Sequence, residues 1–297
     1  MCTVTTTGTP ACFTAWITDG VSEYQVLCTW AGVRHRCYQG SAVASAFVAT
    51  TIAVGRARHV WEDDVDSIIA PSRFLEQKLI ESGISPAKIV VKPHGVEDPG
   101  PRLNPPSSSG TVLFVGRLSH EKGADTLLQA WAAGHDPALR LVFLGDGPLR
   151  EELEGRGVAD VEFRGWQSAD DVGEAMLTAR ALMFPSVCYE NLPRAVVEAL
   201  ACGLPVLASN HGGPGELVAG LGPRWAVPPS DVAAWTTALG VLTDGEQVDE
   251  AGGTARRLFL EHYTVEATTA SLLAIYDDAR RASATDPLAG APAGGPP

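Results

Sequence analysis

Hydrophobic and polar positions follow two different patterns along the chain, and the change falls near residue 110. Beyond that point, short apolar runs alternate with longer amphipathic stretches. The apolar runs predict strands at residues 111–115, 139–144, 161–163, 181–184 and 205–209. The amphipathic stretches predict helices at residues 121–133, 148–154, 169–179, 193–201, 231–242 and 246–281. Strict alternation of strands with helices predicts right-handed βαβ units and a doubly wound parallel sheet.

The pattern before residue 100 is less regular. Residues 41–60 predict a helix, and its alanine- and valine-rich stretch 41–55 is apolar enough to predict that this helix is buried. Residues 67–70 and 88–92 each predict a short strand. Between them, residues 73–82 have the period of an amphipathic helix. No element is predicted for residues 1–30, whose pattern has no clear period.

Composition then divides the chain into segments. Residues 99–110 are rich in proline, serine and glycine, which is typical of a linker. The linker separates an amino-terminal domain, residues 1–98, from a carboxyl-terminal domain, residues 111–281. The tail at residues 282–297 consists mainly of alanine, glycine and proline, so we expect it to be disordered.

Charge and hydropathy exclude several classes of protein. The formal net charge of -13 argues against a nucleic-acid-binding protein, because phosphate contacts need a basic face. No apolar run reaches the roughly 18 residues that a membrane-spanning helix requires. The first residues have no basic region ahead of an apolar core, so we expect no signal peptide and a cytoplasmic protein.

The cysteines predict neither a disulfide framework nor a metal site. Their spacing is irregular and includes no C-x-x-C pair, so we expect reduced, buried thiols and no bound metal. The nearest approach to a zinc-binding pattern is His35 with Cys37 and Cys28, which is too sparse to favour zinc over buried thiols. The chain contains six cysteines: Cys2, Cys12, Cys28, Cys37, Cys188 and Cys202.

The first candidate site residues follow the strand at 111–115. Gly116 allows the chain to turn close to a ligand, while Arg117 and Lys122 place two cations in one turn region. An arginine binds phosphate through a planar fork and a lysine as a point charge. The alternative is that both are solvated surface cations.

Two further strand ends offer weaker signals. Gly145 and Gly147 lie in a tight turn after the strand at 139–144, either beside a ligand or as a plain structural turn. Arg164, Gly165 and Trp166 follow the next strand, where backbone groups could reach the edge of a nucleobase. For the tryptophan, packing in the core is the favoured alternative.

The most specific segment is 185–206. Glu190 lies in a loop ahead of a helix that Pro193 opens, and Glu198 lies inside that helix. The free N–H groups and the dipole of a helix amino terminus favour an anion. A carboxylate beside a bound phosphate is repelled, so each glutamate is expected to bind hydroxyl groups instead, one on a sugar and one on a ribose. The alternative is a capping acid and a solvated acid.

Taken together, these motifs resemble the large retaining glycosyltransferase family of GT-B fold that is called family 4, or glycosyl transferases group 1. The resemblance covers about residues 67–276, with the motifs in the family's order. They are Gly116-Arg117 with Lys122-Gly123, Gly145-x-Gly147, Glu190-x₇-Glu198, Ala199-x-Ala201-x-Gly203-x-Pro205-Val206 and Gly212-Gly213-Pro214-Gly215-Glu216.

The resemblance implies a role for most of the candidates. Arg117 and Lys122 are implied to clamp the diphosphate, and Glu190 to hold hydroxyls of the donor sugar; these form the catalytic set. Glu198 is implied to bind the ribose. The remaining donor-binding residues are Gly116, Gly145, Gly147, the backbone N–H groups of Asn191 and Leu192, and Arg164, Gly165 and Trp166 around the base.

The resemblance also implies a reaction: transfer of a hexosyl-type sugar from a nucleoside diphosphate to a hydroxyl of a carbohydrate, lipid or small-molecule acceptor, with retention of configuration. It implies no metal and no cofactor beyond the donor, since basic residues offset the leaving-group charge. We expect the protein in the cytoplasm or peripherally at the inner face of a membrane.

The amino-terminal part departs from the family. Only about residues 36–96 resemble the family's acceptor-side, Rossmann-like domain, so we expect a GT-B-like architecture with an abbreviated amino-terminal domain. His94-Gly95-Val96-Glu97 stands where the family has Asn-Gly-Val-Asp, at a hinge. His35 is one candidate for the histidine that the family places near the reacting carbon. A helix at about 265–279 is expected to pack back across the cleft.

Three hypotheses remain open from the sequence. The first is glycosyl transfer, and the second is a catalytically inactive sugar-nucleotide-binding fragment or partner subunit. The third is a sugar-nucleotide epimerase of the same fold. A shortened sheet would expose an edge and apolar faces. We therefore expect either a protein partner or an oligomer that covers the amino-terminal domain, or a chain that is a truncated fragment or a mis-started reading frame.

Overall fold

The computed structural model describes residues 29–36 and 38–285. The amino-terminal part contains a two-stranded parallel sheet in which Ile68 pairs with Ile89 and Ala70 with Val91. Helix α4 connects the two strands and packs on them through Leu75. The elements of this part are α1 (Thr29–Arg34), α2 (Ala42–Ala57), α3 (Val60–Asp63), β1 (Ile68–Ala70), α4 (Arg73–Glu81), a 3₁₀ turn (Pro86–Lys88) and β2 (Ile89–Val91).

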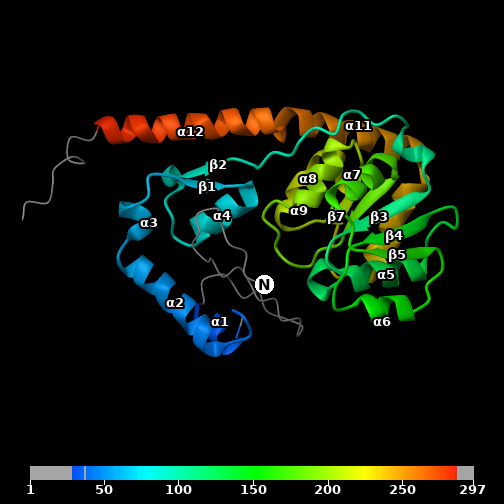
Figure 1. Ribbon diagram of the computed structural model, residues 1–297, viewed down its shortest axis with the longest axis horizontal. Coiled ribbons are helices and arrows are strands. Elements are labelled where there is room, and N and C mark those ends of the chain that lie inside the picture. Colours follow the sequence, from blue (N-terminus) through cyan, green and yellow to red (C-terminus); the bar gives the residue numbers. More distant parts are fainter. Residues whose placement is uncertain (1–28, 37, 286–297) are drawn as a thin grey trace, which may run out of the picture.

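The prediction that residues 41–55 form a buried helix is wrong. The helix exists as α2, but its only buried side chains are Ser45, Val48 and Ala49. Val43 and Phe47 are 81% and 75% exposed. The sequence of α2 places apolar residues on all of its faces. Within the described residues, however, α2 packs mainly on α1 along one face, so its other apolar side chains remain exposed (Figure 1). The predicted helix 41–60 also divides into α2 and the short α3.

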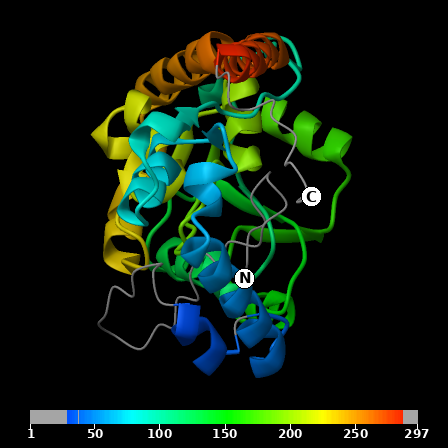
Figure 2. The same ribbon diagram turned by 90° about the vertical axis from the view of Figure 1, so that its left-hand side faces the viewer.

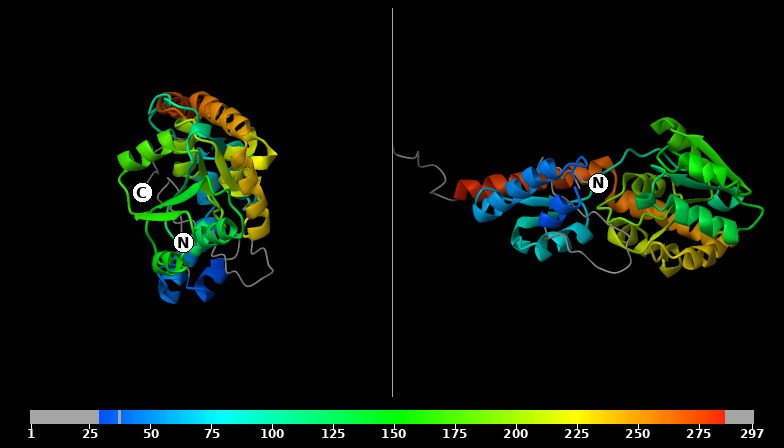
Figure 3. Two further views of the ribbon diagram at one scale, coloured as in Figure 1. Left: turned by 90° about the vertical axis from the view of Figure 1, so that its right-hand side faces the viewer. Right: turned by 90° about the horizontal axis from the view of Figure 1, so that it is seen from below.

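The carboxyl-terminal part is the predicted doubly wound parallel sheet. Its strands are ordered β5-β4-β3-β6-β7-β8, and every neighbouring pair is parallel. The left view of Figure 3 shows this sheet between its helices. Its strands are β3 (Thr111–Val115), β4 (Arg140–Leu144), β5 (Val161–Gly165), β6 (Ala181–Phe184), β7 (Val206–Ser209) and β8 (Ala226–Val227). Its helices are α5 (Ala124–Ala133), α6 (Arg150–Gly155), α7 (Ala169–Thr178), α8 (Arg194–Ala201), α9 (Gly212–Val218), α10 (Val232–Ala238) and α11 (Gly245–His262).

Both faces of this sheet are buried because successive side chains of a strand point to opposite sides. In β3, Val112 and Phe114 belong to one core cluster, which also contains residues of α5 and α10. Leu113 belongs to the other, with residues of α7 and α8. The continuous apolar runs of the sequence therefore reflect burial on two sides.

The stretch 246–281, predicted to be helical, is two helices, α11 and α12 (Val265–Thr285), and α12 is the terminal helix expected at about 265–279. The break coincides with a crossing of the chain, where the N–H of Val96 donates to the Tyr263 carbonyl at 3.0 Å. Gly95 is needed there, since a Cβ atom would overlap Thr268 Oγ1. Beyond the break, α12 runs back over β1 and β2, as Figures 1 and 2 show.

One boundary differs from prediction. Helix α12 includes residues 282–285, which the sequence assigned to a disordered tail, and residues 286–297 lie outside the described chain. The proline-rich segment 99–110 follows the surface of the carboxyl-terminal part, where Arg102 donates to the Ala179 carbonyl at 2.6 Å.

Within residues 29–36 and 38–285, no helix combines the length and apolar character needed to cross a membrane.

Candidate functional site

The site lies where the strand order of the larger sheet reverses. From β3 the chain proceeds outward to β4 and β5, and it then returns to the other side of β3 to form β6, β7 and β8. Loops at the carboxyl ends of two adjacent strands with opposite onward connections diverge, which leaves a crevice between them. The loops after β3 and β6 therefore face each other here, and both carry predicted site residues.

Glycines allow the loops after β3, β4 and β5 to stack closely. Gly116 N donates to the Leu144 carbonyl at 3.0 Å, and Gly145 N donates to the Gly165 carbonyl at 2.7 Å. A Cβ atom on Gly145 would overlap the Gly116 carbonyl, and one on Gly147 would overlap Leu118. These predicted donor-binding glycines thus have a demonstrable role in bringing strand ends together.

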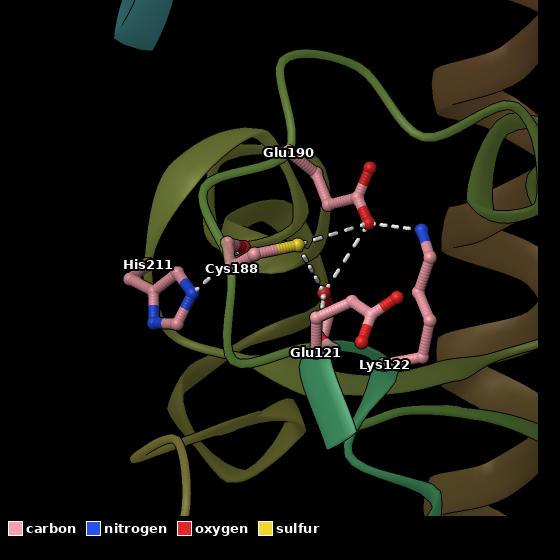
Figure 4. A network of polar contacts seen from close by, with 6 residues as sticks. Glu121, Lys122, Cys188, Glu190 and His211 are labelled. Carbon is pink, nitrogen blue, oxygen red and sulfur yellow. Dashed lines mark hydrogen bonds and ion pairs between the residues drawn. The ribbon is translucent and has the colours of Figure 1, made fainter. Parts of the chain in front are cut away.

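Lys122 and Glu190 meet across the crevice. Lys122 ends a 3₁₀ turn, His120–Lys122, and its Nζ contacts Glu190 Oε1 as an ion pair. The same Oε1 lies 3.2 Å from Ser186 Oγ and 3.6 Å from Cys188 Sγ. Figure 4 shows the other carboxylate oxygen, Oε2, directed away from this cluster. It has no hydrogen-bond partner in the part of the chain that the structure describes, so it can accept from a ligand.

Ser186 and Cys188 were not predicted as site residues. They precede Glu190 by four and two positions. Alternate positions of an extended segment point to the same side. That spacing is the signal that could have identified them. The Ser186 hydroxyl also lies 3.1 Å from the Glu121 carbonyl, and Val187 N donates to the same carbonyl at 3.0 Å.

Two side chains near Glu190, the Cys188 thiol and the His211 imidazole, are neutral at neutral pH. Burial raises the pKa of the Cys188 thiol, and the Glu190 charge raises it further. Burial lowers the pKa of His211, whose Nε2–H donates to the Cys188 carbonyl at 3.1 Å. With a neutral thiol and a neutral imidazole, the charges of the cluster are those of Lys122, Glu190 and the neighbouring Glu121 carboxylate.

The second predicted carboxylate, Glu198, has a different environment. It lies inside α8 and its Oε1 pairs with Arg194 Nε at 2.6 Å. The side chain of His94 is near this pair. Burial lowers the pKa of His94, and the charges of Arg194 and Lys92 add to this effect. His94 Nε2 is buried without a partner in the described structure.

The amino terminus of α8 presents free backbone donors. The helix begins at Arg194 with Pro193 as its N-cap. The N–H groups of Asn191 and Leu192, ahead of the cap, donate to no acceptor within the described residues. Arg117, across the crevice on the β3 loop, is exposed and makes no ion pair within the described residues. These groups are available to an anion.

The structure at the end of β5 contradicts the core-packing alternative for Trp166. Trp166 is 77% exposed, so packing in the core, which was the favoured alternative, is wrong. Trp166 is the first residue after the strand, and its side chain is exposed to solvent. Arg164 is exposed and pairs with Glu162 at 2.7 Å. The carbonyl of Gly165 accepts a hydrogen bond from Gly145 N at the end of the neighbouring strand.

The metal hypothesis falls largely outside the described residues, which exclude Cys28 and Cys37. His35 is described and exposed. Within the described parts of the chain, no three His, Cys, Asp or Glu side chains gather as metal ligands do. Cys188 and Cys202 are free thiols; Cys202 is buried, as expected, whereas Cys188 is only partly buried.

A doubly wound sheet with a lysine, a carboxylate and free helix-terminal N–H groups at its switch point defines an α/β domain suited to an anionic ligand. Comparison with known families makes this class specific. Residues 109–244 match the family model described as Glycosyl transferases group 1. The chain therefore contains a glycosyl transferases group 1 domain.

Two curated relatives extend this similarity. The chain is 31% identical over 256 residues to the 2-deoxystreptamine N-acetyl-D-glucosaminyltransferase of Streptomyces fradiae, covering 81% of this chain and 58% of the relative. It is 31% identical over 223 residues to the 2-deoxystreptamine glucosyltransferase of Streptomyces kanamyceticus, covering 71% of this chain and 57% of that relative. The chain thus spans less than two thirds of the length of either.

Solved structures confirm the predicted GT-B-like α/β fold. The sucrose-phosphate synthase of Thermosynechococcus elongatus superposes with a TM-score of 0.67 at 23% identity, covering 84% of this chain and 66% of that one. Anabaena HepE, in complex with UDP and glucose, superposes with a TM-score of 0.63 at 20% identity, covering 72% of this chain and 63% of that one.

Proposed function

We propose that this protein transfers a sugar from a nucleoside diphosphate donor to an acceptor hydroxyl with retention of configuration. The observation that carries this proposal is the Lys122–Glu190 pair at the switch point, beside free N–H groups at the start of α8. A cation and amide donors suit a diphosphate, and a carboxylate with one unpaired oxygen suits sugar hydroxyls. Both stand on one crevice, as a sugar bound to a diphosphate requires.

The diphosphate is bound by Arg117, Lys122 and the N–H groups of Asn191 and Leu192. When the donor binds, its phosphate oxygens replace the Glu190 carboxylate as the ion-pair partner of Lys122. The carboxylate, still held by Ser186, accepts hydrogen bonds from the sugar. Because these donors are fixed before the reaction, they stabilise the charge that develops on the departing diphosphate without reorganising.

The nucleoside lies toward the other end of the crevice. Glu198 binds the ribose hydroxyls, which replace its ion pair with Arg194. Gly116, Gly145 and Gly147 allow the donor to approach the backbone, and residues 164–166 lie beside the base, with the Trp166 side chain on the outside. We propose no metal and no cofactor other than the donor for this reaction.

Retention is proposed to follow from attack on the face that the diphosphate leaves. The acceptor oxygen forms a bond to the anomeric carbon while the bond from that carbon to the phosphate oxygen breaks. The acceptor proton passes to the departing phosphate oxygen. Glu190 orients the sugar for this step, while Arg117 and Lys122 bind the leaving group.

For the acceptor we propose an aminocyclitol of the 2-deoxystreptamine type, with N-acetylglucosamine or glucose as the sugar. Two relatives at 31% identity are named for these substrates, which supports testing them first. The UDP in the HepE structure supports UDP as the nucleotide to test first.

The test is a transfer assay with UDP-N-acetylglucosamine or UDP-glucose and 2-deoxystreptamine, followed by mass spectrometry and by NMR of the anomeric proton. We expect the same anomer in the product as in the donor. Glu190→Gln should reduce the rate about 10²-fold, which is the size of effect expected for a group acting on the transition state. Glu174→Ala, an exposed glutamate on α7, is the control and should leave the rate unchanged.

Other outcomes contradict parts of the proposal. An inverted anomer would exclude retention. Donor binding without turnover for any acceptor would favour the inactive sugar-nucleotide-binding alternative. An isomerised donor would favour an epimerase.

A further inference from the structure

Glu216 closes the last sequence motif of the predicted site, and the proposed reaction gives it no role. It lies on α9, and its side chain reaches the amino-terminal part of the protein. Glu216 Oε1 accepts from Arg73 N at 3.1 Å, and Oε2 accepts from Phe74 N at 3.0 Å. These are the first two residues of α4, so one carboxylate caps a helix that lies more than 140 positions earlier in the chain.

The chemistry of this contact is specific. The first N–H groups of a helix have no partner inside the helix, and its dipole attracts a negative charge. Ser72 Oγ accepts from Leu75 N at 3.2 Å, so it serves a different N–H group. The carboxylate of Glu216 supplies the hydrogen-bond acceptors that the N–H groups of Arg73 and Phe74 lack inside the helix. Burial raises the pKa of Tyr263 to about 12, and the charge of Glu216 adds to this rise, so Glu216 also lies near the α11–α12 junction.

A second contact joins α4 to the site. The ring of Phe74 lies 5.0 Å from the ring of Tyr189, and Lys78 Nζ lies 5.7 Å from the same ring. Tyr189 directly precedes Glu190 and also contacts His211 at 5.3 Å, edge to face. The side chain before the proposed sugar-binding carboxylate is therefore packed between α4 and the start of α9.

A third contact fixes the backbone of Glu190. Gly213 N, on α9, donates to the Glu190 carbonyl at 2.7 Å. A Cβ atom on Gly213 would overlap the Asn191 carbonyl, so helix and loop are in direct contact. Helix α9 thus touches the loop at Glu190 and holds α4 through Glu216, while α4 touches the same loop at Tyr189.

We propose that Glu216 is a positioning residue for Glu190. By capping α4 it keeps Phe74 against Tyr189, and the loop 187–191 is held from both sides. The inference rests on the proposed function of Glu190 as the residue that binds the donor sugar. It implies that the amino-terminal part contributes to donor-sugar recognition through α4 without contacting the sugar. The nucleotide depends less on this contact, because Arg117, Lys122 and the other strand ends supply most of its proposed contacts and only Asn191 lies in this loop.

The first test measures amide hydrogen exchange in Glu216→Ala. We expect faster exchange at Phe74, whose N–H loses its acceptor, and faster exchange across 187–191. Glu174→Ala is the matched control and should change neither segment. If exchange across 187–191 is unchanged in Glu216→Ala, the positioning role is wrong, whether or not the protein is an active transferase.

The second test removes one hydrogen bond from the other side. Proline is well accepted at the first position of a helix and has no N–H, so Arg73→Pro deletes one donor to Glu216 while keeping α4. Arg73→Ala keeps this N–H but removes the same side chain, including its ion pair with Glu76, and is the control. We expect Arg73→Pro, and not Arg73→Ala, to reproduce the faster exchange across 187–191, while Phe74 N–H keeps its bond to Glu216 Oε2. This variant also covers the case in which Glu216→Ala folds poorly.

The third test separates sugar from nucleotide. Glu216→Ala and Arg73→Pro should bind UDP within about twofold of the wild type but lose about five- to tenfold in the rate of transfer, the size expected for one hydrogen bond. A parallel loss of UDP affinity would mean a general structural effect and would overturn the inference. If the wild type shows no transfer, the proposed function fails, and the exchange experiments still decide the structural role of Glu216.

Discussion

At the scale of single residues, Glu190 is the residue on which the polar contacts of the site converge, and the reactivity of Cys188 depends on its charge. The thiol lies 3.6 Å from Glu190 Oε1. Burial raises the pKa of Cys188, the Glu190 charge raises it further, and the Lys122 charge lowers it. Because thiolates are the reactive form of cysteine, the alkylation rate of Cys188 measures the balance of these two charges.

Opposite changes are therefore expected from two variants. Glu190→Gln removes the negative charge, lowers the pKa of Cys188 and should speed its reaction with iodoacetamide about two- to tenfold, since one pKa unit is tenfold in thiolate near neutral pH. Lys122→Met should slow it. Peptide mapping by mass spectrometry measures both rates, with Cys202 as reference because burial raises its pKa to about 11. Changes of the same sign in both variants would contradict the observed arrangement.

The sequence predicted Lys122 and Glu190 as site residues but not their contact. They are 68 positions apart, and only the neighbouring positions of β3 and β6 in the sheet bring them together. The environment of Trp166 was not predictable for a similar reason. Whether a residue after a strand faces inward depends on where the strand ends, and β5 continues to Gly165 rather than ending at Phe163.

At the scale of elements, the site depends on the close approach of the loops that follow β3 and β6. Gly123 is the C-cap of the 3₁₀ turn that carries Lys122, and it has a φ of 69°. A Cβ atom there would overlap the Pro185 carbonyl. Both the left-handed backbone and the close contact therefore require glycine at this position.

Gly123→Ala should destabilise the protein by roughly 1–3 kcal/mol, because it combines backbone strain with overpacking. Gly173→Ala is the matched control. Gly173 lies inside α7, with no atom within 4 Å of a built Cβ, so alanine there should stabilise by about 0.5–1 kcal/mol. Urea unfolding measures both. Equal stability of Gly123→Ala and the wild type would contradict the described approach of the two loops.

Elements of the carboxyl-terminal part were predictable because their local patterns agree with their environment. The strand 181–184 was predicted with its observed bounds, since all its residues are apolar and both faces of the sheet are covered. The position of the break between α11 and α12 does not show in the periodicity of 246–281, because its cause is a distant segment. The chain at Gly95 and Val96 crosses at the junction of the two helices, and the pattern of apolar residues within 246–281 does not indicate that crossing.

At the scale of the whole molecule, the two parts differ in how far the sequence determines them. The doubly wound sheet buries two apolar faces against its own helices, so pattern and burial coincide. In the amino-terminal part, α2 exposes Val43 and Phe47, and the composition that predicted burial misleads. The two parts are joined by the crossing at Val96, by the Asp98–Arg256 ion pair at 2.7 Å and by the cap that Glu216 places on α4.

We propose that the switch point of the larger sheet binds a nucleoside diphosphate. Isothermal titration of the full chain with UDP, GDP and ADP tests it most directly. We expect one of them to bind, and Lys122→Ala to weaken that binding by about 10- to 100-fold, the size expected for a lost hydrogen bond to a charged group. Glu174→Ala should bind as the wild type does. The absence of binding by all three nucleotides, or equal affinities of Lys122→Ala and the wild type, would contradict the account.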